Sequence, residues 1–322
     1  MMKPSISAII LTYNEELNLG NCLKSVVDLA SEIFIVDGGP AGVYSKDRTF
    51  EIAKKYNCKI FKHLYENQAK QFNWALDNLK IKTEWILRLD ADEYLTDELK
   101  KEISEVLFNK GTSDVQNIDG NNRTSDVQIN QLNPYKSAST IINGFYIKRR
   151  VYFMGRWIKH GGYYPAWFLR IFRYGKARYE EREVDEHAVL LGGRASRLKN
   201  DFVDDNKHKL EWWIGKQNNH SSREVLALLR EEEEKDKIRV SPSFFGNQAE
   251  RKRWMKEKFF MKSPMFFRAL LYFIYRYFFR LGFLDGKEGL IFHFLQGFWY
   301  RFLVDAKFFE ARKAKVEKID KV

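Results

Sequence analysis

The sequence predicts an α/β fold, in which a mostly parallel sheet is flanked by helices, followed by an α-helical C-terminal region. Three observations lead to this prediction. The first hundred residues alternate between short apolar runs of strand length and segments with helical spacing. Polar and acidic residues directly follow several of these runs. The last part of the chain is basic and aromatic, and its apolar residues are interrupted by regularly spaced cations.

The N-terminal elements follow from the apolar period. Four runs are short and rich in apolar residues, as buried strands are: residues 5–11, 32–36, 58–61 and 84–89. Helical spacing falls between them, at residues 19–30, 47–56 and 71–79. Strands and helices that alternate in this way are typical of βαβ units and of a parallel sheet. The order continues with a helix from Thr96, strands at 141–148 and 167–172, and a helix at 209–229.

The composition of the chain changes twice and so suggests its domains. Residues 110–139 are polar, lack periodicity and contain the pentapeptide Thr-Ser-Asp-Val-Gln twice, which predicts a mobile surface insertion. We expect a catalytic α/β domain over residues 1–235 that carries this insertion. A basic, aromatic, amphipathic helical region over residues 236–322 is expected to attach the chain to a membrane.

The charge of the chain is concentrated in its last part. The 322 residues include 55 Lys and Arg and 43 Asp and Glu, a net charge of +12. Residues 251–322 alone hold 17 basic and 7 acidic residues, and 20 of the 50 aromatic residues. A basic and aromatic segment predicts an anionic membrane or a nucleic acid as partner. Contiguous apolar residues and the lack of a nucleic-acid-binding motif exclude the second.

The tail predicts a helix that lies in the membrane interface. Residues 265–284 approach the length of a membrane span, about 20 residues. Arg268, Arg276 and Arg280 would make such a span costly, and with Tyr272 they form one polar stripe at helical spacing. The alternatives are a spanning hairpin, or ordinary packing on the catalytic domain or on a second subunit of a homo-oligomer.

Cysteine content and the N-terminus indicate the compartment. Cys22 and Cys58 are the two cysteines, too few for a disulfide scaffold or a cysteine-based zinc site. The first residues lead directly into a predicted strand, without the apolar stretch of a secretory signal. We therefore expect the cytoplasm, and with the tail the cytoplasmic face of the inner membrane.

Polar side chains at the predicted strand ends indicate a binding site. Ligands of such sheets bind beyond the carboxyl ends of the strands, which brings residues 12–15, Asp37, Asp90 and Asp92 to one edge. The carboxylates of Asp90 and Asp92 repel each other unless they share a cation, and oxygen ligands suit Mg²⁺ or Mn²⁺. Diphosphate oxygens would complete the coordination. The alternative is an acidic loop without a metal.

Four segments resemble the family 2 glycosyltransferases: Ser-Ala-Ile-Ile-Leu-Thr-Tyr-Asn-Glu-Glu at 7–16, Ile-Val-Asp-Gly-Gly at 35–39, Asp-Arg-Thr at 47–49 and Leu-Asp-Ala-Asp-Glu at 89–93. The resemblance implies the Rossmann-like GT-A fold, a nucleotide-sugar donor, a divalent metal and inversion at the anomeric carbon. It implies that the nucleotide pocket is lined by Thr12, Tyr13, Asn14 and Glu15. Asp37 would contact the base, Asp90 the ribose or the metal, and Asp92 the metal. The segment between Asp37 and Asp47 is longer than in the family.

The middle of the chain is similar to the bacterial lipopolysaccharide-core and exopolysaccharide branch. The similarity lies in residues 153–165, 169–173, 175–179 and 184–187. The family's Val-His-Glu reads Val-Asp-Glu here, so Glu186 matches its glutamate and Asp185 replaces its histidine. An inverting displacement needs a carboxylate that takes the proton of the acceptor hydroxyl, which we expect to be Glu186, with Asp185 in reserve. A solvated acidic turn is the alternative.

Three basic residues are further candidates for the donor site. Arg170 and Arg173 lie three apart in a predicted strand, so we expect them on opposite faces, with Arg170 as the candidate for the donor pyrophosphate. His160 precedes two glycines that allow close approach of the backbone to a phosphate or to the acceptor. A structural role is the alternative for His160.

The sequence thus predicts an inverting, metal-dependent glycosyltransferase. It would act on a lipid-linked, lipopolysaccharide or exopolysaccharide acceptor, and the similarity of residues 272–286 and 298–302 to the ends of exopolysaccharide-type enzymes implies an acceptor carried on lipid. The alternative is a membrane-associated scaffold that binds nucleotide but no longer catalyses transfer.

Overall fold

The computed structural model of the chain describes residues 4–108, 141–180, 187–233 and 263–319. The described residues form two compact units, one within 4–108 and 141–209 and the other within 210–319. The helix α5 (Leu210–Glu233) therefore groups with the C-terminal helices, whereas the predicted boundary at residue 235 left it with the catalytic domain. The polar insertion expected at 110–139 lies outside the described residues.

The N-terminal strands of the first unit form the parallel half of one sheet. They are β1 (Ile6–Thr12), β2 (Glu32–Asp37), β3 (Lys59–Lys62) and β4 (Trp85–Asp90). In the order β3-β2-β1-β4 every neighbouring pair is parallel, so the carboxyl ends of these strands reach the same edge. The α/β fold with a mixed, partly parallel sheet and flanking helices is confirmed, and the four predicted strands lie within one residue of their expected bounds.

The second half of the sheet is mixed, with parallel and antiparallel pairs of strands. It continues from β4 as β8 (Trp167–Arg173), β6 (Ile142–Phe153), β11 (Arg194–Asp205) and β5 (Glu93–Leu95), with β7 (Arg156–Ile158) paired to β6. Because β8 is antiparallel to both β4 and β6, while β11 is parallel to β6, the carboxyl ends of β6 and β11 return to the edge where β4 ends. A small separate sheet pairs β9 (Ala177–Tyr179) with β10 (Ala188–Leu190).

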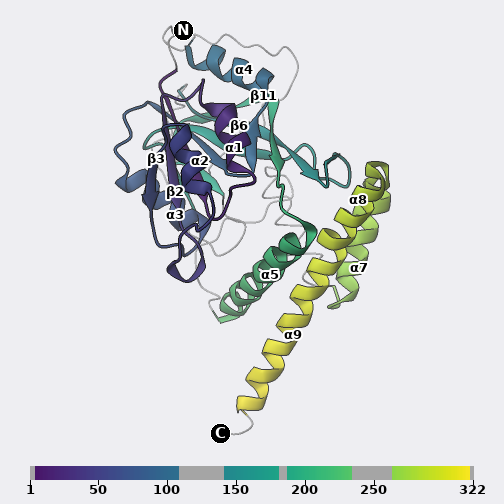
Figure 1. Cartoon of the computed structure of the whole chain (residues 1–322). Coiled ribbons are helices and arrows are strands. Elements are labelled where there is room, and N and C mark those ends of the chain that lie inside the picture. Colours follow the sequence, from purple (N-terminus) through teal and green to yellow (C-terminus); the bar gives the residue numbers. More distant parts are fainter. Residues whose placement is uncertain (1–3, 109–140, 181–186, 234–262, 320–322) are drawn as a thin grey trace. The chain divides into compact units, whose positions relative to one another are not determined.

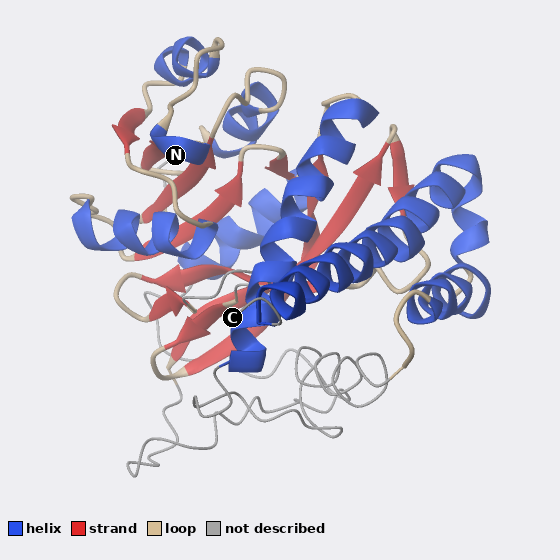
Figure 2. Cartoon of the chain, turned by 90° about the horizontal axis from the view of Figure 1, so that it is seen from below, coloured by secondary structure: helices blue, strands red, loops and turns tan. Residues whose placement is uncertain are grey.

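Helices cover both faces of the large sheet (Figures 1 and 2). One core contains residues of α1 (Leu19–Val26), α2 (Thr49–Lys55) and α4 (Asp97–Phe108), packed on strand residues such as Ile10 and Leu87. The other contains α3 (Gln68–Asn78), whose Phe72 is fully buried. Because the central strands are apolar on both faces, both faces must be covered.

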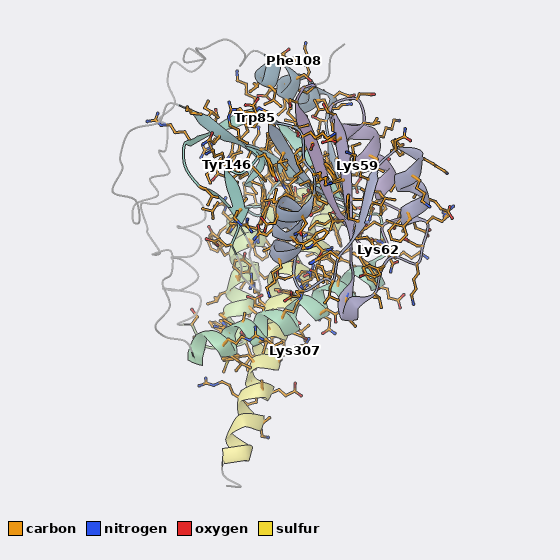
Figure 3. All side chains as sticks on the ribbon, turned by 90° about the vertical axis from the view of Figure 1, so that its left-hand side faces the viewer. Lys59, Lys62, Trp85, Phe108, Tyr146 and Lys307 are labelled. Atoms are coloured by element: carbon orange, nitrogen blue, oxygen red, sulfur yellow. The ribbon has the colours of Figure 1, made fainter. Side chains whose placement is uncertain are left out.

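The outer strand β3 is protected by its own charges. Lys59 and Lys62 stand on this edge strand and are exposed (Figure 3). The ammonium of Lys59 pairs with Glu32 at 2.5 Å, and that of Lys62 lies 5.1 Å from the ring centre of Tyr44. Lysine side chains on an edge strand oppose pairing with another sheet, so the sheet ends here.

The second unit is helical throughout its described part. Its elements are α5, α7 (Phe267–Ile274), the π-helix η4 (Tyr275–Phe279), the 3₁₀ turn η5 (Gly282–Asp285), α8 (Gly286–His293), the π-helix η6 (Phe294–Trp299) and α9 (Tyr300–Ile319). α5 packs on α9 through Val225, Tyr300 and Val304. Of the helices in the described ranges, none combines the length and the apolar character that a membrane crossing requires.

The continuous helix with one polar stripe, predicted for residues 265–284, is wrong. The helical segment ends before Leu281, which has a left-handed backbone conformation with φ of 60°. Arg268 is buried and forms an ion pair with Asp305 of α9, whereas Arg276 is partly exposed and Arg280 is exposed. The stripe is a prediction from spacing alone. Spacing within residues 265–284 does not show that Asp305, 37 positions after Arg268, forms a buried ion pair with it.

Candidate active site

Three strand ends of the first unit meet at one edge of the sheet. β1, β2 and β4 are adjacent, with Thr12 opposite Asp37 and Leu11 opposite Asp90. The hydroxyl of Thr12 donates a hydrogen bond to Oδ1 of Asp37 at 2.9 Å. The predicted gathering of Thr12, Asp37 and Asp90 at one edge is therefore present.

The carboxylate of Asp37 is fully buried and accepts three hydrogen bonds. Besides Thr12, Ser45 donates its hydroxyl to Oδ1 at 2.5 Å and its backbone N–H to Oδ2 at 2.8 Å. These bonds satisfy a buried charge that would otherwise be costly. In this conformation Asp37 ties the end of β2 to the segment that follows it. Its contact with a nucleotide base stays a prediction.

Tyr13, Asn14 and Glu15 are partly exposed, in contrast to the buried Thr12. Asn14 has a left-handed backbone with φ of 52°, and its N–H donates to the Ser45 hydroxyl at 2.7 Å. The ring of Tyr13 lies against Gly39, where a Cβ would stand 2.1 Å from the ring. These side chains can therefore face a ligand, while their backbone is held by the lengthened segment after Asp37.

Asp47 joins the same segment to the start of α1. Its carboxylate accepts from the N–H of Glu16 at 2.9 Å and from the hydroxyl of Thr49 at 2.5 Å. The longer loop, which includes the 3₁₀ turn η1 (Pro40–Gly42), thus leaves Asp47 within reach of the residues after β1. The departure from the family pattern does not displace Asp47 from this edge.

Asp90 is surrounded by donors. Its Oδ1 accepts from Arg88 at 3.0 Å and from Gln68 at 3.1 Å, and Nη2 of Arg170 lies 3.7 Å from Oδ2. Both arginines are buried, with 6% and 2% of their surface exposed. The Arg88 guanidinium also lies 4.6 Å from the ring centre of Tyr179. The negative charge of Asp90 is therefore compensated by the protein itself.

Glu93 completes this buried charge network. Its carboxylate pairs with Arg170 and accepts from the N–H of Asp90 at 2.9 Å. Burial raises the pKa of Glu93 to about 8, and the charges of Asp90 and Asp204 act in the same direction, while Arg170 and Arg88 oppose them. Glu93 thus fixes the turn that follows β4.

Asp92 has a different environment. It is partly exposed, and its Oδ2 accepts from the amide of Asn206 at 2.9 Å. Its backbone C=O accepts from the N–H of Asp205 at 2.9 Å, which holds the turn against the end of β11. Among the residues that the structure describes, the partner of the Asp92 carboxylate is a neutral amide and no cation forms an ion pair with it, in contrast to Asp90.

The residues at this edge fit a magnesium or manganese ion that the substrate helps to bind. Within the described ranges no three His, Cys, Asp or Glu side chains form a metal-binding group. Mg²⁺, however, is commonly held by one or two carboxylates, water and substrate phosphates. Asp92 has the uncompensated charge for this role, whereas Asp90 is already paired with arginines.

Four of the predicted site residues come from later parts of the chain. Glu186 and Asp185 lie outside the described residues. His160 lies in the loop between β7 and β8. Arg170 contacts Glu93 and Asp90, so a direct contact with the donor pyrophosphate stays a prediction.

The expected opposite faces of Arg170 and Arg173 are wrong. The Arg170 guanidinium lies over Phe202 and that of Arg173 over Trp85, both in the same hydrophobic core. The register of β8 against β6 shifts between Leu169 and Ile171, which interrupts the strict alternation of side chains.

Sequence reasoning missed three residues that shape this edge: Gln68, Arg88 and Glu93. It also did not predict the contact of Asn206 with Asp92. A buried arginine within an apolar strand and the glutamate directly after Asp92 were signals that could have identified two of them. Gln68 and Asn206 are close to the aspartates only through the tertiary fold.

Comparisons with known proteins find similarity to glycosyltransferases. A "lipopolysaccharide core biosynthesis glycosyltransferase LpsC" of Rhizobium meliloti is 26% identical over 207 residues, 61% of each chain. An "uncharacterized glycosyltransferase" of Rickettsia bellii is 32% identical over 106 residues, 33% of this chain, and the match spans 34% of the length of that relative. The S. aureus TarS 1–349 structure aligns over 96% of this chain and 92% of its own, at 14% identity, with a TM-score of 0.38, too low for a comparison of folds.

The family assignment depends on the N-terminal half of the chain. The sequence profile of glycosyl transferase family 2 matches residues 7–173, which begin in β1 and end with β8. This range is more than half of the 322 residues and contains the edge with Asp37, Asp90 and Asp92. The chain therefore belongs to glycosyl transferase family 2.

Proposed function

We propose that the chain transfers a sugar from a nucleotide-sugar donor to a glycan acceptor, with inversion at the anomeric carbon. The observation that carries the proposal is the contrast between two aspartates at one strand end. Asp90 is held by Arg88, Gln68 and Arg170, whereas Asp92 keeps an uncompensated charge beside Asn206. Such an edge can hold both the hydroxyl groups and the charged part of a nucleotide sugar.

The donor would lie along the edge formed by β1, β2 and β4. Tyr13, Asn14 and Glu15 are partly exposed there and offer a ring, an amide and a carboxylate to the nucleoside. Asp90, oriented by its arginines, would accept hydrogen bonds from the ribose. The buried Thr12 and Asp37 hold the backbone from which these groups project.

Asp92 would hold Mg²⁺ or Mn²⁺ together with the diphosphate of the donor. When bound, the ion neutralises the negative charge that develops on the departing nucleoside diphosphate. Asn206 keeps the Asp92 carboxylate in place by donating to Oδ2. Glu93 and Arg170 hold the turn between the two aspartates.

The acceptor hydroxyl would attack the anomeric carbon as the bond to the diphosphate breaks. Its proton must go to a carboxylate, for which Glu186 is our candidate, with Asp185 in reserve. The leaving group departs as the nucleoside diphosphate, so one displacement gives inversion.

The second unit supports an acceptor at a membrane surface. Large apolar side chains are exposed on its described helices: Phe267, Leu271, Phe278, Phe279, Phe283, Leu284, Leu290 and Phe294. Arg276 lies in η4, and Arg280 is the residue directly after it. A surface of this composition is typical of helices that lie in a membrane interface. We propose a lipid-linked or lipopolysaccharide-type acceptor at the cytoplasmic face of the inner membrane.

Replacement of Asp92 tests the activity. We expect Asp92→Ala to lower donor hydrolysis and transfer at least about a hundredfold, because a charge that acts in the reaction is removed. The matched control is Asp97→Asn, which changes an exposed aspartate of α4. Release of nucleoside diphosphate from a panel of nucleotide sugars with Mn²⁺ is the measurement. Unchanged rates in Asp92→Ala would exclude the proposal.

A binding measurement distinguishes the enzyme from a scaffold that binds nucleotide without catalysing transfer. Calorimetric titration of the wild-type chain with nucleoside diphosphates and Mn²⁺ measures binding independently of turnover. Binding without hydrolysis or transfer on any acceptor would identify the scaffold.

A further inference from the structure

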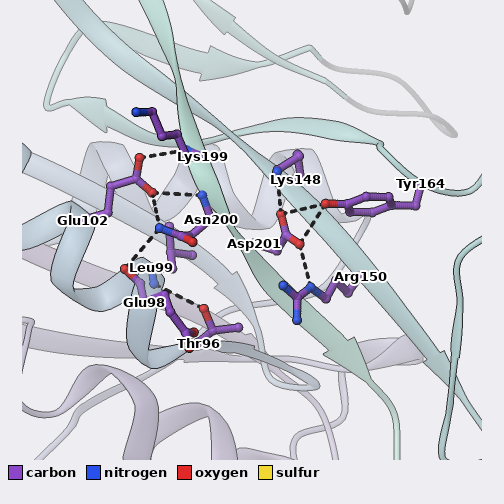
Figure 4. A network of polar contacts seen from close by, with 10 residues as sticks. All are labelled: Thr96, Glu98, Leu99, Glu102, Lys148, Arg150, Tyr164, Lys199, Asn200 and Asp201. Carbon is purple, nitrogen blue, oxygen red and sulfur yellow. Dashed lines mark hydrogen bonds and ion pairs between the residues drawn. The ribbon is translucent and has the colours of Figure 1, made fainter. Parts of the chain in front are cut away.

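A second cluster of charged side chains lies on β6 and β11 of the first unit. Its centre is Asp201, whose carboxylate contacts three side chains (Figure 4). Nε of Arg150 lies 2.6 Å from Oδ2, Nζ of Lys148 lies 3.1 Å from Oδ1, and the hydroxyl of Tyr164 donates to Oδ2 at 3.0 Å. None of these residues is among the contacts of Asp37, Asp90 and Asp92 described above.

The cluster holds two cations on one carboxylate. The side chain of Asp201 is 2% exposed, whereas those of Arg150 and Lys148 are 34% and 19% exposed. Asp201 thus lies beneath the cations and neutralises one of them. The remaining positive charge is directed toward the surface and is held in a fixed geometry, because a buried carboxylate keeps its partners firmly.

Aromatic rings fix the same cations from the sides. The Arg150 guanidinium lies 5.0 Å from the ring centre of Trp157, and the Lys148 ammonium lies 5.6 Å from that of Trp167. Trp157 and Tyr164 meet edge to face at 5.1 Å. Cation–π contacts of this kind restrict the side chains without neutralising their charge. The cluster is therefore an ordered cationic surface.

The position of the cluster relates it to the acceptor. Trp167 begins β8 and Arg150 lies near the end of β6, so both lie toward the edge at which β4 ends. In the sheet β6 is two strands from β4, a lateral distance of about 10 Å. At this distance a ligand group would lie beside a donor bound at Asp90 and Asp92.

We propose that Lys148 and Arg150 bind an anionic group, phosphate or carboxylate, on a sugar of the acceptor. This inference rests on the proposed function, which needs an acceptor beside the donor. Arg150 can donate two hydrogen bonds to such a group and Lys148 supplies a second charge. The acceptor is then a phosphorylated or uronic acid-containing glycan and not a neutral one.

Ligand-observed saturation-transfer NMR on the full chain tests the proposal. The probes are glucose 6-phosphate, glucuronate, inorganic phosphate and glucose. We expect glucose 6-phosphate or glucuronate to bind more tightly than both glucose and inorganic phosphate. Whichever of these two anionic sugars binds more tightly identifies the anionic group as phosphate or carboxylate. Equal binding of glucose, or inorganic phosphate that binds as tightly as the sugars, would overturn the proposal.

Variants connect the binding to the cluster. Arg150→Gln and Lys148→Gln each leave Asp201 with one cation and Tyr164, and each should weaken binding of the anionic sugar about tenfold. Arg150→Lys should retain most of the binding. Lys199→Gln, an exposed lysine on the same strand as Asp201, is the control with an equal loss of charge. Wild-type affinity in both glutamine variants would refute the assignment.

The outcome can be separated from that of the proposed function. Donor hydrolysis is measured without an acceptor, and sugar binding is measured without a donor. A chain that fails to hydrolyse any donor but binds an anionic sugar through Arg150 contradicts the proposed function alone. Competition between a nucleoside diphosphate and the anionic sugar for Arg150 would assign the cluster to the donor and overturn the inference.

Discussion

The two units place apolar and charged side chains in opposite ways. In the first unit Phe72 and Phe172 are fully buried, and charged residues gather at one edge of the sheet. In the described part of the second unit, Phe278 and Phe279 are 54% and 75% exposed, while Arg268 is buried. The first unit follows the usual pattern of a water-soluble domain, and the second follows it only in part.

Buried charges have a different role in each unit. Around Asp90 and Glu93 the buried charges hold the turn that follows β4. The pair of Arg268 and Asp305 has both side chains nearly inaccessible and fixes one helix against another. The exposed Phe278 and Phe279 belong to an apolar surface of the second unit. Contact of this surface with water is unfavourable, and contact with an apolar partner is favourable.

Replacing one buried and one exposed phenylalanine should give the largest difference between the two units. Phe72 is 0% exposed and Phe279 is 75% exposed. We expect Phe72→Ala to cost about 4 kcal/mol of unfolding free energy, through lost burial and a cavity. Phe279→Ser should leave that free energy nearly unchanged and lower binding to anionic liposomes about tenfold. Chemical denaturation and liposome flotation measure the two effects, and a large loss of stability in Phe279→Ser would contradict the contrast.

The buried ion pair of the second unit is the next largest effect. Asp305→Asn removes the charge that compensates Arg268, which stays buried. We expect a loss of about 3 kcal/mol of unfolding free energy, because a buried cation without a partner is costly. Arg268→Met combined with Asp305→Leu should recover most of it. A denaturation series of the single and double variants is the measurement, and an unaffected Asp305→Asn would exclude a structural role for the pair.

A smaller effect is expected beside Asp92. Asn206→Ala removes one hydrogen bond to the Asp92 carboxylate without touching a charge. We expect the rate of donor hydrolysis to fall about fivefold, which corresponds to about 1 kcal/mol. Asn200→Ala on the same strand, whose amide contacts Glu102, serves as the control. Equal rates in Asn206→Ala and wild type would show that Asp92 needs no orientation by this amide.

The smallest effect concerns pH and the second unit. Burial, with help from Arg223 and Lys216, lowers the pKa of His220 in α5 to about 4. Between about pH 6.5 and pH 4 the unfolded state therefore binds a proton that the folded state does not, so stability falls as the pH falls. We expect a loss on the order of 1 kcal/mol, absent in His220→Gln. Denaturation at pH 7 and pH 4.5 checks it, and identical pH dependence of both proteins would refute it.

The sequence predicted the parallel half of the sheet well, for a physical reason. Strands buried on both faces are short and apolar, and the helices between them bury one face, so two distinct periods alternate. Residues 5–11 and 84–89 therefore predicted β1 and β4 almost residue by residue. The short strand β5 was not predicted, because its pairing with β11 joins segments a hundred residues apart.

The sequence predicted that the acidic residues lie at one edge of the sheet, and it did not predict which cations pair with them. Asp37, Asp90 and Asp92 each follow an apolar strand, so topology alone places them at one edge. Which charge pairs with which depends on tertiary contacts: Arg88 and Arg170 reach Asp90, and Asp305 captures Arg268. Spacing within one segment carries no information about such partners. For this reason the spacing of residues 265–284 predicted one polar stripe, which the structure does not have.

The link between β11 and α5 limits how the chain can change. It consists of residues 206–209, of which Asn206 contacts Asp92 and the N–H of Lys207 donates to Asn18 at 2.8 Å. Connections between units usually tolerate insertions and deletions, because few contacts hold them. Here a residue gained or lost would move Asn206, the hydrogen-bond donor to the Asp92 carboxylate. We therefore expect this connection to tolerate changes in length poorly.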